Sequence, residues 1–140
     1  MDDCLFCKIV RGEMPAHRIW EDERTLAFLD IYPGTAGHAL VVPKAHARDL
    51  FDLPADDRDA VFATARRVAA GLVAETGAEG INLHQANGKA AGQVIFHFHL
   101  HLLPRREGDG LRCPWIPSEG DAGALADLAG RLRDRLAAPD

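Results

Sequence analysis

The sequence predicts an α+β domain in which an antiparallel five-stranded sheet is combined with one long helix and a C-terminal helix. The 140 residues contain no internal repeat and no linker-like change of composition, and this length is enough for one domain with its own core. Five short segments have strand-like patterns, and the connections between them leave little room for the crossovers that parallel strands need. Two longer segments have helical periodicity. We therefore expect a single domain over residues 1–140.

The strands are expected in five places. The segments are residues 17–21, 25–29, 38–43, 80–85 and 94–103. The first two would form a hairpin around the polar turn Asp22-Glu23-Arg24. A short helical turn over residues 4–11 precedes them and ends at Gly12, because glycine interrupts helices.

The long helix is expected over residues 55–75, where apolar side chains recur at helical spacing and acidic residues occupy the first turns. Gly77 marks its end, because glycine readily adopts the left-handed conformation that terminates helices. A second set of apolar residues at helical spacing predicts the C-terminal helix. Its residues are Leu125, Leu128, Leu132 and Leu136.

Charge and cysteine content exclude several classes of protein. The chain has 16 Lys and Arg against 21 Asp and Glu, a formal net charge of −5, and no basic stripe, so a nucleic-acid partner is not expected. The acidic start Met1-Asp2-Asp3 is unlike a signal peptide, and no apolar run reaches membrane-spanning length. Three cysteines are too few for a disulfide scaffold. We expect a protein of the reducing cytoplasm without a membrane partner.

The most informative motif is His97-Phe98-His99-Leu100-His101-Leu102-Leu103. On a strand the three histidines would share one face, and their apolar neighbours would face the core. Imidazole titrates near neutral pH and can act as nucleophile, acid, base or metal ligand. The pattern alone leaves two chemistries open. The three rings could bind one metal ion, as in a zinc-dependent hydrolase, or one ring could attack an electrophile while the others orient it.

The segment before the motif favours phosphoryl or nucleotidyl chemistry. It reads Asn87-Gly88-Lys89-Ala90-Ala91-Gly92-Gln93 and leads directly into the histidines. Glycines allow the backbone to approach a phosphate closely, and backbone N–H groups can then surround it.

The histidine motif matches the signature of the histidine triad (HIT) nucleotide-binding proteins, and the sequence resembles this family over most of its length. The supporting segments are residues 6–10, 13–15, 27–31, 37–46 and 92–93. The resemblance is to the small bacterial Hint-type members. It implies a HIT-like fold, a homodimer, and a purine nucleotide hydrolase or transferase.

By this resemblance, His99 would attack the α-phosphorus of a nucleotidyl conjugate. A nucleotidyl-histidine would form, and water would then release a nucleoside monophosphate. His101 would contact the phosphate or assist the leaving group, and His38 would support His101. Phosphoramidates, dinucleoside polyphosphates and related conjugates are all compatible with this chemistry.

The resemblance also implies a nucleotide-binding set. Asp30 would accept hydrogen bonds from the ribose hydroxyls. The apolar slot for the base would be formed by Leu5, Phe6, Ile9, Phe28 and Ile31, each of which could instead be an ordinary core residue. The phosphate would meet Asn87, Gly92, Gln93 and Val94, together with His99 and His101.

Val94 departs from the family pattern. Serine or threonine often follows the Gly-Gln pair, and its hydroxyl contacts the phosphate or the leaving group. The backbone N–H of Val94 remains, but the side-chain hydrogen bond is absent. We therefore expect slower cleavage of conjugates with amine leaving groups than in relatives that carry serine at this position.

Cys4 and Cys7 have the spacing of half a structural zinc site. A redox pair or two free buried thiols are the alternatives, although no strand precedes Cys4 as in thioredoxin-like motifs. The resemblance implies that His46 and His97 complete the ligand set of a structural Zn²⁺. Such an ion would join the N-terminal turn, the loop after the third strand and the first histidine of the motif.

A nucleotide-binding scaffold with little activity is the alternative to an enzyme. Val94 favours the scaffold, whereas the presence of His99, His101, His38 and Asp30 favours catalysis. No role is assigned to three further residues, which are His17, His84 and Cys113.

Overall fold

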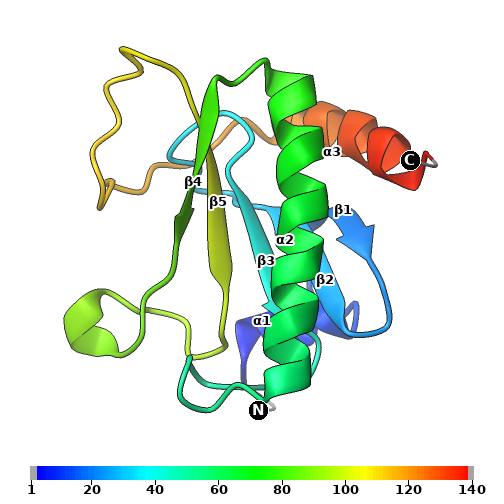
Figure 1. Ribbon diagram of the computed structural model, residues 1–140, viewed down its shortest axis with the longest axis vertical. Coiled ribbons are helices and arrows are strands. Elements are labelled where there is room, and N and C mark those ends of the chain that lie inside the picture. Colours follow the sequence, from blue (N-terminus) through cyan, green and yellow to red (C-terminus); the bar gives the residue numbers. More distant parts are fainter. Residues whose placement is uncertain (1–2, 139–140) are drawn as a thin grey trace.

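Five antiparallel strands form one sheet at the centre of the computed structural model, which describes residues 3–138 (Figure 1). The strands lie in the order β1-β2-β3-β5-β4, with β1 at His17–Glu21, β2 at Thr25–Leu29, β3 at Ala39–Pro43, β4 at Gly80–His84 and β5 at Leu100–Arg105. Every neighbouring pair is antiparallel. The predicted α+β class and the five-stranded sheet are therefore confirmed. Met1 and Asp2 of the acidic start lie outside the described residues.

Helices α1, α2 and α3 cover the two faces of the sheet, whereas a short 3-10 helix lies in the loop between β4 and β5 (Figure 1). They are α1 at Leu5–Val10, α2 at Ala55–Thr76, the short 3-10 helix η1 at Lys89–Ala91, and α3 at Ala122–Ala137. Gly77 ends α2 in the left-handed conformation, as predicted, and the side chain of Asp121 accepts a hydrogen bond from the Ala124 N–H to cap α3. Within residues 3–138, no helix is long and apolar enough to cross a membrane.

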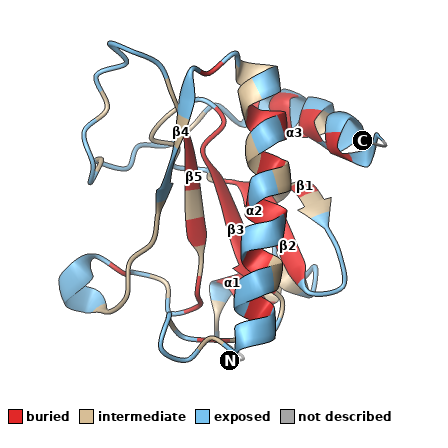
Figure 2. Ribbon diagram, in the orientation of Figure 1, coloured by how far each residue is buried: buried red, intermediate tan, exposed pale blue. Residues whose placement is uncertain are grey.

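Two apolar clusters lie on opposite faces of the sheet. The larger one joins α2 and α3 to side chains from β1, β2, β3 and β5. The smaller one joins α1 to the other face of β2 and β3. Burial on both faces explains why β2 and β3 are buried throughout, whereas β4 at the edge is largely exposed (Figure 2).

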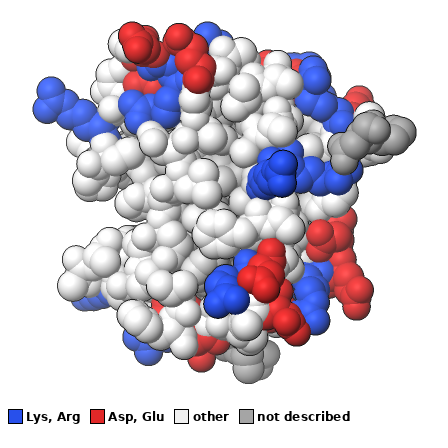
Figure 3. Space-filling view, in the orientation of Figure 1, with Lys and Arg blue, Asp and Glu red and all other residues white. Residues whose placement is uncertain are grey.

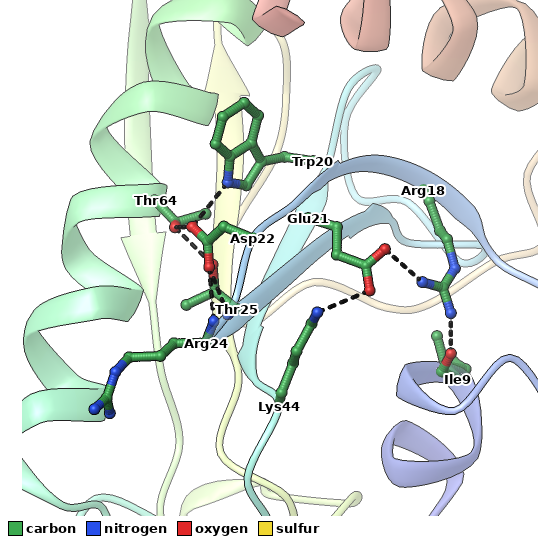
Figure 4. A network of polar contacts seen from close by, with 9 residues as sticks. All are labelled: Ile9, Arg18, Trp20, Glu21, Asp22, Arg24, Thr25, Lys44 and Thr64. Atoms are coloured by element: carbon green, nitrogen blue, oxygen red, sulfur yellow. Dashed lines mark hydrogen bonds and ion pairs between the residues drawn. The ribbon is translucent and has the colours of Figure 1, made fainter.

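The carboxylate of Asp22, in the exposed β1–β2 turn, holds the hairpin to α2 (Figure 4). Asp22 accepts hydrogen bonds from the Arg24 and Thr25 backbones and from the Trp20, Thr25 and Thr64 side chains. Burial alone would raise the pKa of Asp22, but these hydrogen bonds lower it. The polar turn predicted from the sequence is therefore also an anchor for the long helix.

The structure corrects several predicted boundaries. The motif strand begins at Leu100 rather than residue 94, because its pairing with β3 stops at Leu100 and Val41, two residues before β3 ends at Pro43. Beyond that point Phe98 donates its N–H to the Ala47 carbonyl in the following loop. Smaller shifts place the start of β3 one residue later, the end of β4 one residue earlier and the end of α2 one residue later than predicted.

Replacing Leu132 with alanine is expected to lower the free energy of unfolding by about 2–5 kcal/mol. Leu132 on α3 is completely buried in the larger cluster, so its loss leaves a cavity. Chemical denaturation measures this change. Leu50→Ala is the matched control, because Leu50 is 47% exposed and should change stability by less than about 0.5 kcal/mol. Equal effects of the two substitutions would contradict the assignment of the core.

Candidate active site and metal centre

His99 is held in one tautomer by a backbone carbonyl. Its Nδ1 lies 2.8 Å from the carbonyl oxygen of His97, and because a carbonyl only accepts, Nδ1 must carry the proton. The lone pair on Nε2 is therefore available for bonding. Burial lowers the pKa of His99, so the ring is neutral at neutral pH. Phe6 packs edge-on against it, with ring centroids 5.1 Å apart.

A chain of hydrogen bonds fixes the tautomer of His101. The Gly34 N–H donates to Nδ1 of the fully buried His38 at 2.9 Å, so His38 carries its proton on Nε2. That N–H donates to Nδ1 of His101 at 2.9 Å, which leaves the proton of His101 on its own Nε2. Burial lowers the pKa of His38 to about 4 and that of His101 to about 2. His101 therefore presents a neutral N–H donor beside His99, with the two rings 4.9 Å apart.

Gly37 allows the turn that positions His38. Its φ of +86° is disfavoured for residues with a side chain, and an added Cβ would lie 2.9 Å from Thr76 Cγ2. The Asp30 carboxylate is also near, with Oδ2 3.4 Å from His38 Nε2. Asp30 Oδ1 accepts the Tyr32 N–H at 2.8 Å, so this half-buried carboxylate is fixed at the end of β2.

Two residues at the site were not assigned from the sequence. His84 on β4 pairs with His101 on β5, and their rings lie 5.6 Å apart. Trp115 contacts His38, His84 and His101, with centroid distances of 5.0, 5.2 and 5.1 Å. The pairing of the two strands could have indicated His84, because side chains directly opposite each other share a face. No local pattern indicates Trp115, which lies in the long loop between β5 and α3.

Cys4, Cys7, His46 and His97 form a compact cluster whose ligand atoms all lie within 4.8 Å of one another. Nδ1 of His97 is 3.5 Å from both sulfurs, and Nδ1 of His46 is 3.3 Å from the Cys7 sulfur. A tetrahedral zinc ion with ordinary bond lengths separates sulfur and nitrogen ligands by about 3.5 Å. The four predicted residues therefore fit a closed, structural zinc site.

The surroundings of the cluster also suit a metal ion. His97 is fully buried, and its Nε2–H donates to the Pro43 carbonyl at 2.8 Å, which leaves Nδ1 free to act as a ligand. Burial and the neighbouring Cys4 raise the pKa of the Cys7 thiol to about 11. A bound divalent cation would supply the positive charge that keeps such a thiol deprotonated.

The three motif histidines do not converge on one point. His97 faces the two cysteines, His99 donates to a carbonyl, and His101 is bonded to His38. Among residues 3–138, no group of potential metal ligands contains all three rings. The arrangement therefore favours a nucleophilic imidazole over a metal ion held by the whole triad.

The residues predicted for the base slot differ in exposure. Phe6, Ile9 and Phe28 are buried in the smaller cluster. Leu5 and Ile31 are 38% and 49% exposed, so their side chains are available to a ligand. The roles of these residues in nucleotide binding stay predictions.

The side chains of the predicted phosphate loop mainly hold the loop together. Buried Gln93 accepts the Gly88 N–H and donates to the carbonyls of Arg48 and Ile95. The side-chain oxygen of Asn87 accepts the Leu50 N–H. The two remaining residues, Gly92 and Val94, are exposed, with 84% of Val94 accessible. Phosphate contacts by this loop also stay predictions.

Residues 11–108 match the model of the HIT domain family, and the chain therefore belongs to the HIT family. The chain is a hydrolase of this family, as the relatives below indicate. It is 38% identical over 138 residues to adenosine 5'-monophosphoramidase HNT1 of Saccharomyces cerevisiae, with 98% of this chain and 85% of the relative covered. It is 42% identical over 114 residues to adenylylsulfatase HINT3 of Arabidopsis thaliana, with 81% of this chain and 56% of the relative covered.

The fold also matches solved structures of this family. A Zn-bound histidine triad family protein from Mycobacterium smegmatis superposes with a TM-score of 0.86 at 42% identity, with 97% of this chain and 94% of that chain covered. The HIT-like fold expected from the sequence is thereby confirmed.

Proposed function

We propose that the chain cleaves nucleotidyl conjugates at the α-phosphate through a nucleotidyl intermediate on His99. The observation that carries this proposal is the pair of fixed tautomers: His99 has a free Nε2 lone pair, and His101 has an Nε2–H donor beside it. The names of the two relatives support a nucleotide monoester product. With a net charge of −5, small nucleotides rather than nucleic acids are the proposed substrates.

The proposed reaction has two steps. His99 Nε2 forms a bond to the α-phosphorus, and the leaving group departs with the bonding electron pair and takes a proton from water. The His101 N–H donates a hydrogen bond to the phosphoryl oxygen or the leaving atom, where negative charge develops. In the second step, the hydroxide left after water has protonated the leaving group, or another water molecule, attacks phosphorus. This releases the nucleoside monophosphate and neutral His99. One water is consumed in total.

Trapping the intermediate tests the proposal. The protein is mixed with adenosine 5'-phosphoramidate, quenched under conditions that preserve phosphohistidine, and analysed by peptide mass spectrometry. An AMP adduct on His99 together with AMP release is expected. Nucleotide binding without AMP release would support the scaffold function instead, and an adduct on another residue would contradict the nucleophile assignment.

We propose that the cysteine–histidine cluster holds structural Zn²⁺ in the cytoplasm. The ligand distances and the Pro43 hydrogen bond support the metal ion. A reducing compartment would keep Cys4 and Cys7, which are free cysteines here, available as ligands.

We also propose that the single domain over residues 1–140 forms a homodimer through the open edge of β4. Among the described residues β4 pairs only with β5, and Leu83 on β4 and Phe62 on α2 are 47% and 49% exposed. Figure 3 shows mainly uncharged atoms over the middle of the face where β4 and β5 lie.

Light scattering tests the proposed homodimer. It should give twice the mass of the chain at micromolar concentration, and a monomer mass would contradict the proposal. Leu83→Glu should weaken the dimer, whereas Leu50→Glu should not.

Val94→Ser is expected to raise kcat/KM for conjugates with amine leaving groups by about 2–10-fold, the effect of one added hydrogen bond. Val94 is 84% exposed, so the substitution opens no core cavity. AMP release from a phosphoramidate measures the change. Val94→Ala is the control, because it removes the same methyl groups without adding a hydroxyl. Equal rates for wild type, Val94→Ser and Val94→Ala would contradict this prediction.

A further inference from the structure

Cys4 and Cys7 are free thiols that the proposed hydrolytic reaction does not use. Cys4 immediately precedes α1, Cys7 lies in its first turn, and the Cys7 N–H donates to the Cys4 sulfur at 3.4 Å. Both sulfurs belong to the cluster whose ligand atoms lie within 4.8 Å of one another. Side-chain rotation can bring two sulfurs at this separation to the disulfide bond length of about 2 Å. The residues that fit a zinc ion are therefore also placed to form a disulfide bond.

The two thiols differ in accessibility. Cys4 is half-buried, whereas only 7% of Cys7 is exposed. The neighbouring Leu5 is 38% exposed, so the chain beside Cys4 reaches the surface. A small oxidant in solution therefore meets Cys4 first. Cys7 lies behind it as the second thiol, which can convert a sulfenic acid on Cys4 into a disulfide.

A disulfide at these positions is incompatible with the zinc site. Zinc binds cysteine as the thiolate, and a structural site needs four ligands. The Nδ1 atoms of His46 and His97 lie 3.3 Å and 3.5 Å from the Cys7 sulfur, and these two imidazoles are the ligands that remain after oxidation. Two imidazoles do not make a closed site, so a bound ion would be released. The start of α1 would then lose its connection to the loop after β3 and to the segment before β5.

Oxidation of the cysteines acts next to the nucleophile. The two residues between the cysteines are Leu5 and Phe6, and the Phe6 ring packs edge-on against His99 with centroids 5.1 Å apart. The far end of α1 is held separately, because Ile9 is buried and its carbonyl accepts a hydrogen bond from the Arg18 side chain. A change at the cysteines therefore displaces Phe6 while the end of α1 stays packed on the sheet.

We propose that Cys4 is a site of oxidation by peroxides, that Cys7 closes the disulfide, and that this modification releases zinc and weakens nucleotide binding. This inference rests on the proposed zinc site and the proposed function, and it adds a redox control of both.

The modification has two steps. The Cys4 thiolate attacks one oxygen of hydrogen peroxide, so that an S–O bond forms, the O–O bond breaks and hydroxide leaves. The Cys7 thiolate then attacks the Cys4 sulfur, so that the S–S bond forms and a second hydroxide leaves. Two protons from solvent convert the hydroxides to water. The two sulfurs lose two electrons in total, the peroxide gains them, and a dithiol reverses the change by thiol–disulfide exchange.

The test uses the full chain loaded with zinc and treated with hydrogen peroxide. A coloured chelator follows zinc release, and peptide mass spectrometry without reduction follows the disulfide between Cys4 and Cys7. Both should appear at the same rate and to the same extent, and reduction followed by added zinc should restore the starting protein. In Cys7→Ser the second step is blocked, so dimedone should trap a sulfenic acid on Cys4.

Cys113→Ser is the matched control, because Cys113 is exposed and lies outside the cluster, and zinc release should match that of wild type. In the wild type Cys113 is also an internal standard for oxidation. Retention of zinc and of both free thiols after Cys113 is completely oxidised would overturn the proposal. Absence of zinc from protein prepared with zinc would overturn the metal centre instead, and the disulfide measured on that protein would still decide the oxidation site.

Calorimetry tests the connection to the active site. AMP should bind the oxidised protein about tenfold more weakly than the reduced, zinc-loaded protein, because the contact between Phe6 and His99 is disturbed. Equal AMP affinity in the two states would overturn this connection. Failure of the reduced protein to bind AMP would instead overturn the proposed function.

Discussion

His99→Ala is expected to lower kcat/KM for a phosphoramidate by about 10⁴-fold to 10⁶-fold, the effect of removing a covalent nucleophile. The reason is geometric. The His97 carbonyl fixes the proton of His99 on Nδ1 and leaves Nε2 as the free lone pair beside the His101 donor. Neither His101 nor His38 can replace it, because Nδ1 of each of these rings accepts a hydrogen bond and Nε2 carries the proton. AMP release under single-turnover conditions measures the loss.

His17→Ala is the control for this experiment. His17 is a half-buried histidine on β1, outside the active site, and its replacement should leave the rate within about twofold of wild type. The His99→Ala protein should still bind AMP and keep its metal content, which would separate loss of chemistry from loss of folding. Wild-type turnover by His99→Ala would exclude His99 as the nucleophile.

Loss of the proposed zinc ion is expected to lower the stability of the folded state strongly. A ligand present at a thousandfold excess over its Kd stabilises the folded state by about 4 kcal/mol. For a domain of this size that corresponds to a decrease in Tm of about 10–15 °C. The cluster joins α1, the loop after β3 and the segment before β5, so its loss frees three separate segments. Cys4→Ser and Cys7→Ser should each lose zinc, measured by mass spectrometry, and show this decrease by calorimetry.

Cys113→Ser is the control, because Cys113 is exposed and lies outside the cluster. Its zinc content and Tm should match those of wild type. Unchanged zinc content in both Cys4→Ser and Cys7→Ser would show that the cysteines are not ligands. Chelation should also lower Tm before activity is lost, whereas a metal ion held by the catalytic histidines would give immediate loss of activity at unchanged Tm.

The sequence motifs predicted which residues form the site better than they predicted how those residues are arranged within it. The spacing of Cys4 and Cys7 and the resemblance to the HIT family predicted a four-residue cluster that the structure assembles. The alternation of the histidine motif predicted correctly that Phe98, Leu100 and Leu102 enter the core. It did not predict that residues 94–99 leave the sheet, because that depends on where the pairing with β3 stops.

The limits of sequence reasoning are clearest at His84 and Trp115. Neither residue belongs to a motif, and each reaches the histidines through pairing or loop packing with distant parts of the chain. The hydrogen bond from Gly34 to His38 is another example, because it depends on the tight turn before β3 rather than on residue type. Such contacts form between residues whose spacing in the sequence carries no periodic signal.

The sequence by itself determined the class of fold, the family, and the residue types available for nucleophilic attack and metal binding. Periodicity records which side chains must be buried, and side-chain chemistry limits what an imidazole or a thiol can do. Tertiary structure alone decided which ring nitrogen carries each proton and which histidine faces the cysteines rather than the active site. Those properties depend on hydrogen-bond partners that only folding brings within about 3 Å, such as the carbonyls of His97 and Pro43 and the N–H of Gly34.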